Sequence, residues 1–141
     1  MSTKNLTKIR VTYADTDAMG IVYHTNYIKW FEIGRAELLR EQGIPYSQIE
    51  TMGYNLPLTE VHCYYLQPAR YDQIILVETE IVYTRRASVK FIYVIFDEKK
   101  EKILVEGESV HACVNRQGKI VRVPAEIVEK IKPSEVKCHE G

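Results

Sequence analysis

The chain has few cysteines and no spacing among them that suggests a disulfide framework. Its 141 residues contain three cysteines, Cys63, Cys113 and Cys138, and no C-x-x-C pair. An odd number without a framework predicts free thiols in a reducing compartment. The opening stretch MSTKNLTKIRVTY lacks the apolar segment of a secretory signal. We therefore expect a cytoplasmic protein.

Long apolar runs and an excess of charge of one sign are also missing. No run approaches the roughly 18 apolar residues that span a membrane, so no membrane span is expected. Lys plus Arg and Asp plus Glu number 19 each, which gives a net charge of zero. Without a global basic field, binding to nucleic acid is not expected. The histidines are His24, His62, His111 and His139, and they lack paired spacing such as H-x-x-x-H, so no metal site is expected from them.

The composition that is present is that of an ordinary globular protein. Hydrophobic residues make up 45% of the chain and charged residues 27%. The length suits one domain that covers residues 1–141 and can bury a core without disulfides or metal. The last segment, residues 133–141, is expected to be frayed.

The first half of the chain predicts one strand followed by one long helix. Residues 6–13 place apolar side chains at alternate positions, as a strand does. A helix of about four turns is predicted next, with Thr25 or Asn26 as its N-cap and Gly43 at its C-terminal end. Its first half is apolar nearly all round, which predicts burial on most sides. Gly34 in its middle suggests a close approach to a packed neighbour.

The second half predicts several strands joined by short turns. A helical turn is expected at 47–52. The segment 88–96 is apolar enough to be a strand covered on both faces. Gly107 is expected to mark a bulge or kink in its strand. The predicted strands lie within 54–68, 73–84, 88–96 and 102–115, the turns at 97–102 and 115–119, and a short helix at 124–132. Short connections favour antiparallel pairing. The segregation of helix and strands predicts an α+β fold, in which an antiparallel sheet curls around the long helix.

The segment ADTDAMGIVYHTNY, residues 14–27, places Asp15 and Asp17 between the first strand and the helix. A phosphatase of the haloacid-dehalogenase type also has Asp-x-Asp after a strand. It would have Thr or Val where Met19 stands, and it would need a parallel sheet with alternating helices. A magnesium site would need more ligands than these two acids. A turn in which both acids cap backbone groups remains open from the pair alone.

The surroundings of Asp17 favour a further interpretation. The residue lies shortly before Gly20 and close to the start of the predicted helix. A helix N-terminus offers unpaired N–H groups and a partial positive charge. Such donors can polarise a carbonyl oxygen while a carboxylate attacks the carbon or activates water. The arrangement therefore suits acyl chemistry.

The segment YADTDAMGIVYHTNYIKWFEIGRAELLR resembles the hotdog-fold acyl-CoA thioesterases of the 4-hydroxybenzoyl-CoA thioesterase and YbgC-like group. It follows their pattern D-x-D-x-x-G-[IV]-V-[YFW]-[HY]-x-x-[YS]. Residues 13–40 carry the specific match, and the parts around TRRAS and VNRQGKIVRVP fit more loosely. The resemblance implies a long helix wrapped by an antiparallel sheet. It also implies thioester hydrolysis without a cofactor and sites formed between subunits, hence a dimer or a tetramer.

The resemblance also implies roles for individual residues. Asp17 matches the catalytic carboxylate, as nucleophile or general base. His24 matches the position whose backbone N–H points at the thioester carbonyl, and its side chain either lines the thioester pocket or bonds only locally. Tyr23 is interpreted as a packing residue whose hydroxyl can touch substrate, and Asp15 as structural.

Basic residues in the later turns could bind the phosphates of coenzyme A, because Arg and Lys are the side chains that favour phosphate binding. In the resembled family comparable regions contact the nucleotide, and here they hold Arg85, Arg86, Arg116 and Lys119. Each of them also fits a solvated turn charge. The remaining His and Cys on strand patterns are interpreted as packed or interface residues, namely Cys63, Cys113, His62 and His111.

The function expected from the sequence is hydrolysis of an acyl-CoA to a carboxylic acid and coenzyme A. The alternative is a thioesterase for acyl carrier protein, or a protein that binds acyl carrier protein or envelope machinery with minor hydrolase activity. The acyl chain is left open, because its tunnel would depend on side chains from two subunits.

Overall fold

The computed structural model describes residues 4–132. They form one five-stranded antiparallel sheet in the order β1-β3-β4-β5-β2, with helices beside it. The strands are β1 (Lys4–Arg10), β2 (Leu58–Tyr65), β3 (Ile74–Arg85), β4 (Ser88–Asp97) and β5 (Ile103–Ala112), and the helices are α1 (Thr25–Glu41), α2 (Tyr46–Thr51) and α3 (Ala125–Lys130). The predicted α+β class and antiparallel sheet are confirmed. The segment 133–141, predicted to be frayed, lies outside the described residues.

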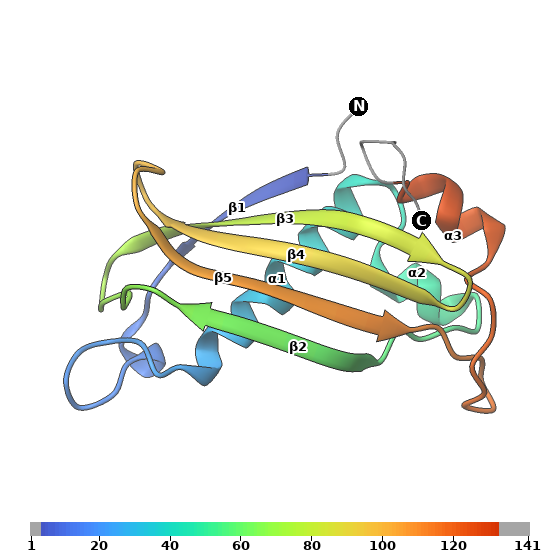
Figure 1. The fold of residues 1–141 in the computed structure, drawn as a ribbon, viewed down its shortest axis with the longest axis horizontal. Helices are drawn as coiled ribbons and strands as arrows, with labels where there is room; N and C mark the ends of the chain where they lie inside the picture. Colours follow the sequence, from blue (N-terminus) through green and yellow to red (C-terminus); the bar gives the residue numbers. More distant parts are fainter. Residues whose placement is uncertain (1–3, 133–141) are drawn as a thin grey trace.

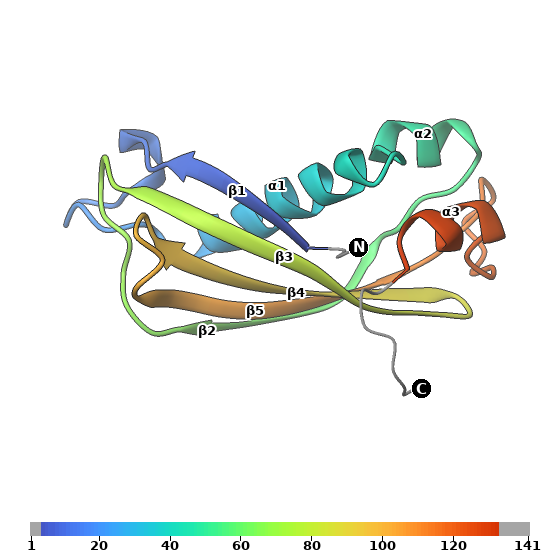
Figure 2. The same cartoon turned by 90° about the horizontal axis from the view of Figure 1, so that it is seen from above.

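Helix α1 lies along one face of the curved sheet (Figures 1 and 2) and packs against β1 and β3. It is 17 residues long and buries Tyr27, Trp30 and Phe31 in its first half. Ile28 and Ile33 stay half-buried. The prediction of burial on most sides is therefore too strong for a single chain, because the sheet covers one side of the helix. Across residues 4–132, no helix is long and apolar enough to cross a membrane.

The start of α1 corrects the predicted cap. His24 is the N-cap and has helical backbone angles, φ −57° and ψ −31°, with no side-chain cap. Thr25 is therefore already inside the helix. The side chain of Asn26 donates instead to the carbonyl oxygen of Asp15, at 2.8 Å. At the other end Gly43 follows the helix with φ +82°, as a C-terminal glycine does.

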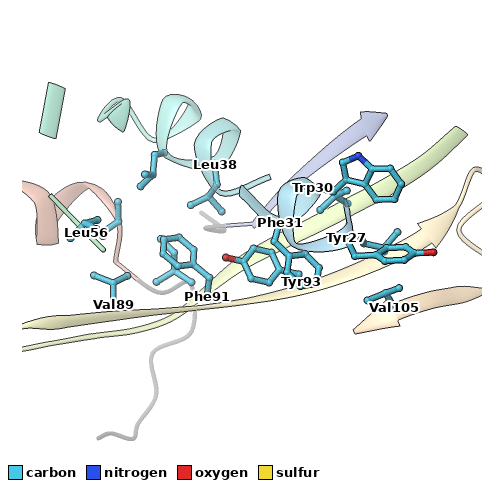
Figure 3. Close-up of a cluster of buried hydrophobic side chains, with 14 of the residues drawn as sticks. Tyr27, Trp30, Phe31, Leu38, Leu56, Val89, Phe91, Tyr93 and Val105 are labelled. Atoms are coloured by element: carbon cyan, nitrogen blue, oxygen red, sulfur yellow. The ribbon is translucent and has the colours of Figure 1, made fainter. Parts of the chain in front are cut away.

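Two glycines make room for the layer between α1 and the sheet (Figure 3). A Cβ on Gly34 would overlap the hydroxyl of Thr79, which explains a glycine inside a helix. Gly107 does not form the predicted bulge, since it pairs in register with Tyr93. A Cβ there would overlap the ring of Phe31, which stacks on Tyr93 with centroids 4.2 Å apart. The glycine serves helix packing, and strand β5 runs through it unbroken.

Strand β4 also differs from its prediction. Buried residues alternate along it with half-buried ones, and among residues 4–132 the long helix α1 lies along one face of the sheet only (Figure 2). The sequence 88–96 is apolar at the half-buried positions as well, for example at Ile92 and Val94. The expectation of cover on both faces is not met within one chain.

Candidate active site

Asp15 is held inside the loop that joins β1 to α1. The residue is 6% exposed, and one carboxylate oxygen accepts bonds from the backbone N–H and the hydroxyl of Thr12, both at 2.9 Å. The other oxygen lies 3.6 Å from the ammonium of Lys29. The backbone carbonyl accepts from the N–H of Tyr23. This carboxylate is engaged in ordering the loop, as the sequence interpretation expected.

Asp17 sits in the same loop and is exposed. One carboxylate oxygen accepts the N–H of Met19 at 2.8 Å, and the backbone forms a tight turn closed by bonds to Ile21 and Gly20. Gly20 has φ +79°, a conformation that glycine adopts without strain. Thr16 and Val22 form a bridge at the base of this turn. The turn therefore presents a carboxylate to solvent next to the segment that enters α1.

The entry to α1 leaves backbone donors free. Within residues 4–132, the N–H groups of His24 and Thr25 have no protein acceptor, whereas the N–H of Asn26 donates to Tyr23. The first N–H groups of a helix have no partner within it, and together they carry a partial positive charge. A carbonyl oxygen placed here would be polarised.

A surface hollow of about 350 Å³ opens at this helix end, between the start of α1 and the segment after β2. His24, Tyr27 and Tyr65 line it, whereas Asp17 and Tyr23 do not. The Tyr65 hydroxyl donates to the carbonyl oxygen of His24 at 3.1 Å, and the Tyr27 hydroxyl accepts the N–H of Ala69. Burial raises the pKa of Tyr27, and it raises that of Tyr65 further with help from Cys63, so both hydroxyls stay protonated.

The predicted phosphate-binding residues lie elsewhere. Arg85 ends β3 and Arg86 follows it in the turn to β4, at the opposite end of the molecule from the loop between β1 and α1 (Figures 1 and 2). Arg85 stacks on the ring of Tyr83 at 4.0 Å. Strand β3, which runs between the two ends, spans roughly 35–40 Å at 3.3 Å per residue. One chain therefore does not bring these arginines to Asp17.

The second predicted pair is Arg116 and Lys119. Their turn, 115–119, lies at the same end of the sheet as the turn between β3 and β4 (Figure 1). The guanidinium of Arg116 donates to the carbonyl oxygen of Thr51 at 3.1 Å and lies against Gly53. Arg116 thus ties its turn to the end of α2. The backbone N–H of Lys119 donates to the side chain of Asn115, and the Lys119 residue is exposed. This residue fits a solvated turn charge.

Comparison with known proteins places the chain in a family. The family model of the thioesterase-like superfamily matches residues 11–131. The chain belongs to the thioesterase-like superfamily. Of its relatives, the acyl-CoA thioester hydrolase YbgC of Escherichia coli O6:H1 is 32% identical over 76% of this chain and 79% of its own length.

Solved structures of similar proteins agree with this membership. A hypothetical protein from Aquifex aeolicus has 35% identity and a TM-score of 0.86, with 91% of this chain and 99% of that chain covered. The DHNA-CoA thioesterase of Staphylococcus aureus has 30% identity and a TM-score of 0.80, with 84% of this chain and 80% of that chain covered.

In this member of the superfamily, sequence reasoning missed Tyr65 and Tyr27 as site residues. Tyr27 stands inside the recognised motif segment, but the helical pattern marks it only as a core position. Tyr65 is the last residue of β2, and no spacing in the sequence links it to His24 at the start of α1. The His and Cys prediction holds in part: His111 and Cys113 are buried, Cys63 is half-buried, and His62 is exposed. Over the described part of the chain, no three His, Cys, Asp or Glu residues cluster as metal ligands.

Proposed function

We propose that the chain is an acyl-CoA thioesterase that hydrolyses its substrate at the start of α1. The observation that carries this proposal is the pair of N–H groups on His24 and Thr25, which have no acceptor among residues 4–132, at a hollow next to the loop that holds Asp17. Membership of the superfamily and the named YbgC relative support the same chemistry. The sheet and α1 would then form the hotdog fold, in which the sheet curves around the helix.

The proposed reaction begins with the thioester carbonyl oxygen at the helix end. The N–H of His24 donates to this oxygen and stabilises the negative charge that develops on it. Asp17 either attacks the carbonyl carbon or takes a proton from the water that attacks it. The C–S bond then breaks, and the thiolate of coenzyme A leaves and gains a proton. When Asp17 is the base, the attacking water supplies the oxygen of the carboxylic acid and Asp17 returns its proton to the thiolate. When Asp17 is the nucleophile, an acyl–Asp17 anhydride forms, and water hydrolyses it to release the acid and restore the carboxylate.

The neighbours of these two groups have supporting roles in the proposal. The Tyr65 hydroxyl holds the carbonyl of His24 and so fixes the peptide at the helix start. Asp15 holds the loop through Thr12 and Lys29, which keeps the turn with Asp17 in place. The His24 ring lies against Tyr23, with centroids 4.6 Å apart, and His24 is one of the residues that line the hollow.

We further propose that the active unit is at least a dimer. Asp17 lies at the opposite end of the folded molecule from the four basic residues Arg85, Arg86, Arg116 and Lys119. These residues can therefore serve this reaction only in the site of a second subunit. Strand β2 is an edge of the sheet with no strand beyond it among the described residues. An unpaired edge favours pairing with another chain. Such a pair would also cover more of α1, whose sequence is apolar on more sides than one chain buries.

The test is a panel of short, long, branched and aromatic acyl-CoAs, with release of the thiol as the readout. Hydrolysis of at least one member by the wild-type protein supports the proposal. The same acyl groups on acyl carrier protein form the second arm, because that substrate is the alternative function. Faster hydrolysis of the carrier-protein esters would assign the chain to them instead. No thiol release from either set would refute the hydrolase and leave a binding role.

A further inference from the structure

A second hollow lies under the middle of α1, away from the thioester site. It has a volume of about 240 Å³ and lies between α1, α2 and the sheet. Leu39, Leu56 and Phe91 give it apolar walls, and Arg35 brings a positive charge. Arg35 is three helical turns beyond His24, or roughly 16 Å along the axis at 1.5 Å per residue. The two hollows of one chain are therefore separate.

The charge of Arg35 has no neutralising carboxylate among the described residues. Within residues 4–132 no carboxylate lies within 4.0 Å of its guanidinium, and its one hydrogen bond goes from Nη1 to the hydroxyl of Tyr93 at 3.1 Å. A guanidinium has five N–H donors in a planar fork that fits a carboxylate. Four of these donors remain free for a ligand at a half-buried position.

A chain of buried hydrogen bonds fixes the orientation of this guanidinium. His111 is 2% exposed, and its Nδ1 faces the carbonyl oxygen of Leu56 at 3.0 Å, so Nδ1 carries the proton. Nε2 then accepts the hydroxyl of Ser109 at 2.9 Å. Ser109 in turn accepts the hydroxyl of Tyr93 at 2.5 Å, and the free lone pairs of Tyr93 face Arg35.

The direction of these hydrogen bonds determines which charge the hollow presents to a ligand. Each of its donors and acceptors is used in one direction, so Tyr93 can only accept from Arg35. Burial and the nearby charge of Arg35 lower the pKa of His111 to about 4, so the imidazole stays neutral and adds no second positive charge. The hollow therefore presents one oriented cation between apolar walls. Phosphate groups are commonly bound by several donors, whereas one fork and apolar walls suit a monocarboxylate.

We propose that this hollow binds an organic carboxylate with an apolar body, with the carboxylate on the guanidinium of Arg35 and the body against Leu39, Leu56 and Phe91. Glu32 also lines the hollow, and its carboxylate weakens the binding of an anion. The ligand is either a free acid or the far carboxylate of an acyl group that reaches in from a thioester. The binding site itself does not depend on the role of Asp17.

The first experiment measures binding by calorimetry at constant ionic strength and pH 7. Benzoate is the probe, and benzamide is its neutral counterpart of the same shape. We expect benzoate to bind at least tenfold more tightly, because the charge-assisted contact is lost with the amide. Equal binding of the two, or no binding of benzoate, overturns the proposal.

Variants then locate the contact. Arg35→Met keeps the length of the side chain and should reduce benzoate affinity about tenfold, to the level of benzamide. Arg40→Met removes a charge from the same helix, where Arg40 pairs with Glu37, and should change nothing. Glu32→Gln should increase benzoate affinity severalfold, which keeps the proposal testable if the Arg35 variant fails to fold. An Arg40 variant that loses as much as the Arg35 variant, or a Glu32 variant with no gain, contradicts the site.

A last pair of measurements separates the two sources of the carboxylate and the two hollows. Asp17→Asn should leave benzoate binding intact, whereas binding at the thioester site would change with it. For an acyl group with a far carboxylate, Arg35→Met should raise the KM of adipoyl-CoA about tenfold and spare hexanoyl-CoA. For a free acid, it should weaken benzoate binding and leave both KM values unchanged. Either result keeps the site, and loss of benzoate binding in Asp17→Asn alone refutes it.

Discussion

Replacing His111 by Gln should reduce the dependence of stability on pH. His111 is buried between Leu56 and Ser109, and burial together with the charge of Arg35 lowers its pKa to about 4. In the unfolded chain its pKa returns to about 6.5. Below pH 6.5 the unfolded chain therefore binds a proton that the folded chain does not take up until about pH 4. The contribution of His111 to stability is complete above pH 6.5 and is lost as the pH falls to 4.

The size of the effect follows from the two pKa values. A fall from 6.5 to about 4, at 1.36 kcal/mol per pKa unit, corresponds to about 3 kcal/mol of unfolding free energy. Gln is the chosen replacement because its amide can accept from Ser109 and donate to the carbonyl of Leu56. A loss of stability at pH 7 is expected from imperfect packing. The loss between pH 6.5 and 4 should be smaller than in the wild type by about 3 kcal/mol.

Urea unfolding at a series of pH values from 7 to 4 measures this quantity. Carboxylates also titrate in this range, and the comparison with wild type removes their shared contribution. His62→Gln is the matched control, because it makes the same substitution at a histidine that is exposed on β2. Parallel curves for His111→Gln and wild type would refute the interpretation of His111 as a buried neutral group.

Three further predictions concern packing, assembly and nucleotide binding. Gly34→Ala should lower the unfolding free energy by about 1–3 kcal/mol in urea titrations, because its Cβ overlaps Thr79, and adding Thr79→Ala should recover part of the loss. Light scattering at micromolar concentration should show a dimer or a tetramer, and a fully active monomer would exclude a shared site. Arg85→Ala or Arg86→Ala should raise the KM of an acyl-CoA up to about tenfold with kcat unchanged. An equal loss on an acyl-pantetheine without the nucleotide would assign these arginines to structure instead.

Most of the strands and helices can be predicted from local patterns of apolar residues in the sequence. Alternating apolar residues predict β3, and the long run without proline before Gly43 predicts α1, because these patterns reflect burial of one face. The misplaced cap at His24 and the incorrect bulge at Gly107 have a common reason. In both cases a contact made by another element decides the conformation: Asn26 bonds to Asp15, and Phe31 packs on Gly107.

The candidate site is predicted only as far as one continuous segment carries it. The loop with Asp17 and the helix start at His24 are adjacent in sequence, so one motif holds both. Tyr65 joins them from strand β2, more than forty residues away, through a hydrogen bond that no pattern encodes. The series of hydrogen bonds from Arg35 to His111 likewise joins residues of α1, β4 and β5 that are far apart in the sequence. The distance of Arg85 from Asp17 depends on the topology of the sheet and became visible only in the structure.

The central claim is that Asp17, and not Asp15, carries the chemistry. The most direct measurement is kcat for Asp17→Asn and Asp15→Asn on the best acyl-CoA of the panel, with circular dichroism to confirm that both variants are folded. Asp17 is exposed, and within the described residues its carboxylate bonds only to Met19, so its replacement should leave stability unchanged and lower kcat by about 10²–10⁴. Asp15→Asn should lose less activity and more stability, because it disturbs the bonds to Thr12 and Lys29. A folded Asp17→Asn variant with wild-type kcat, or a larger loss of kcat in folded Asp15→Asn, would contradict the account.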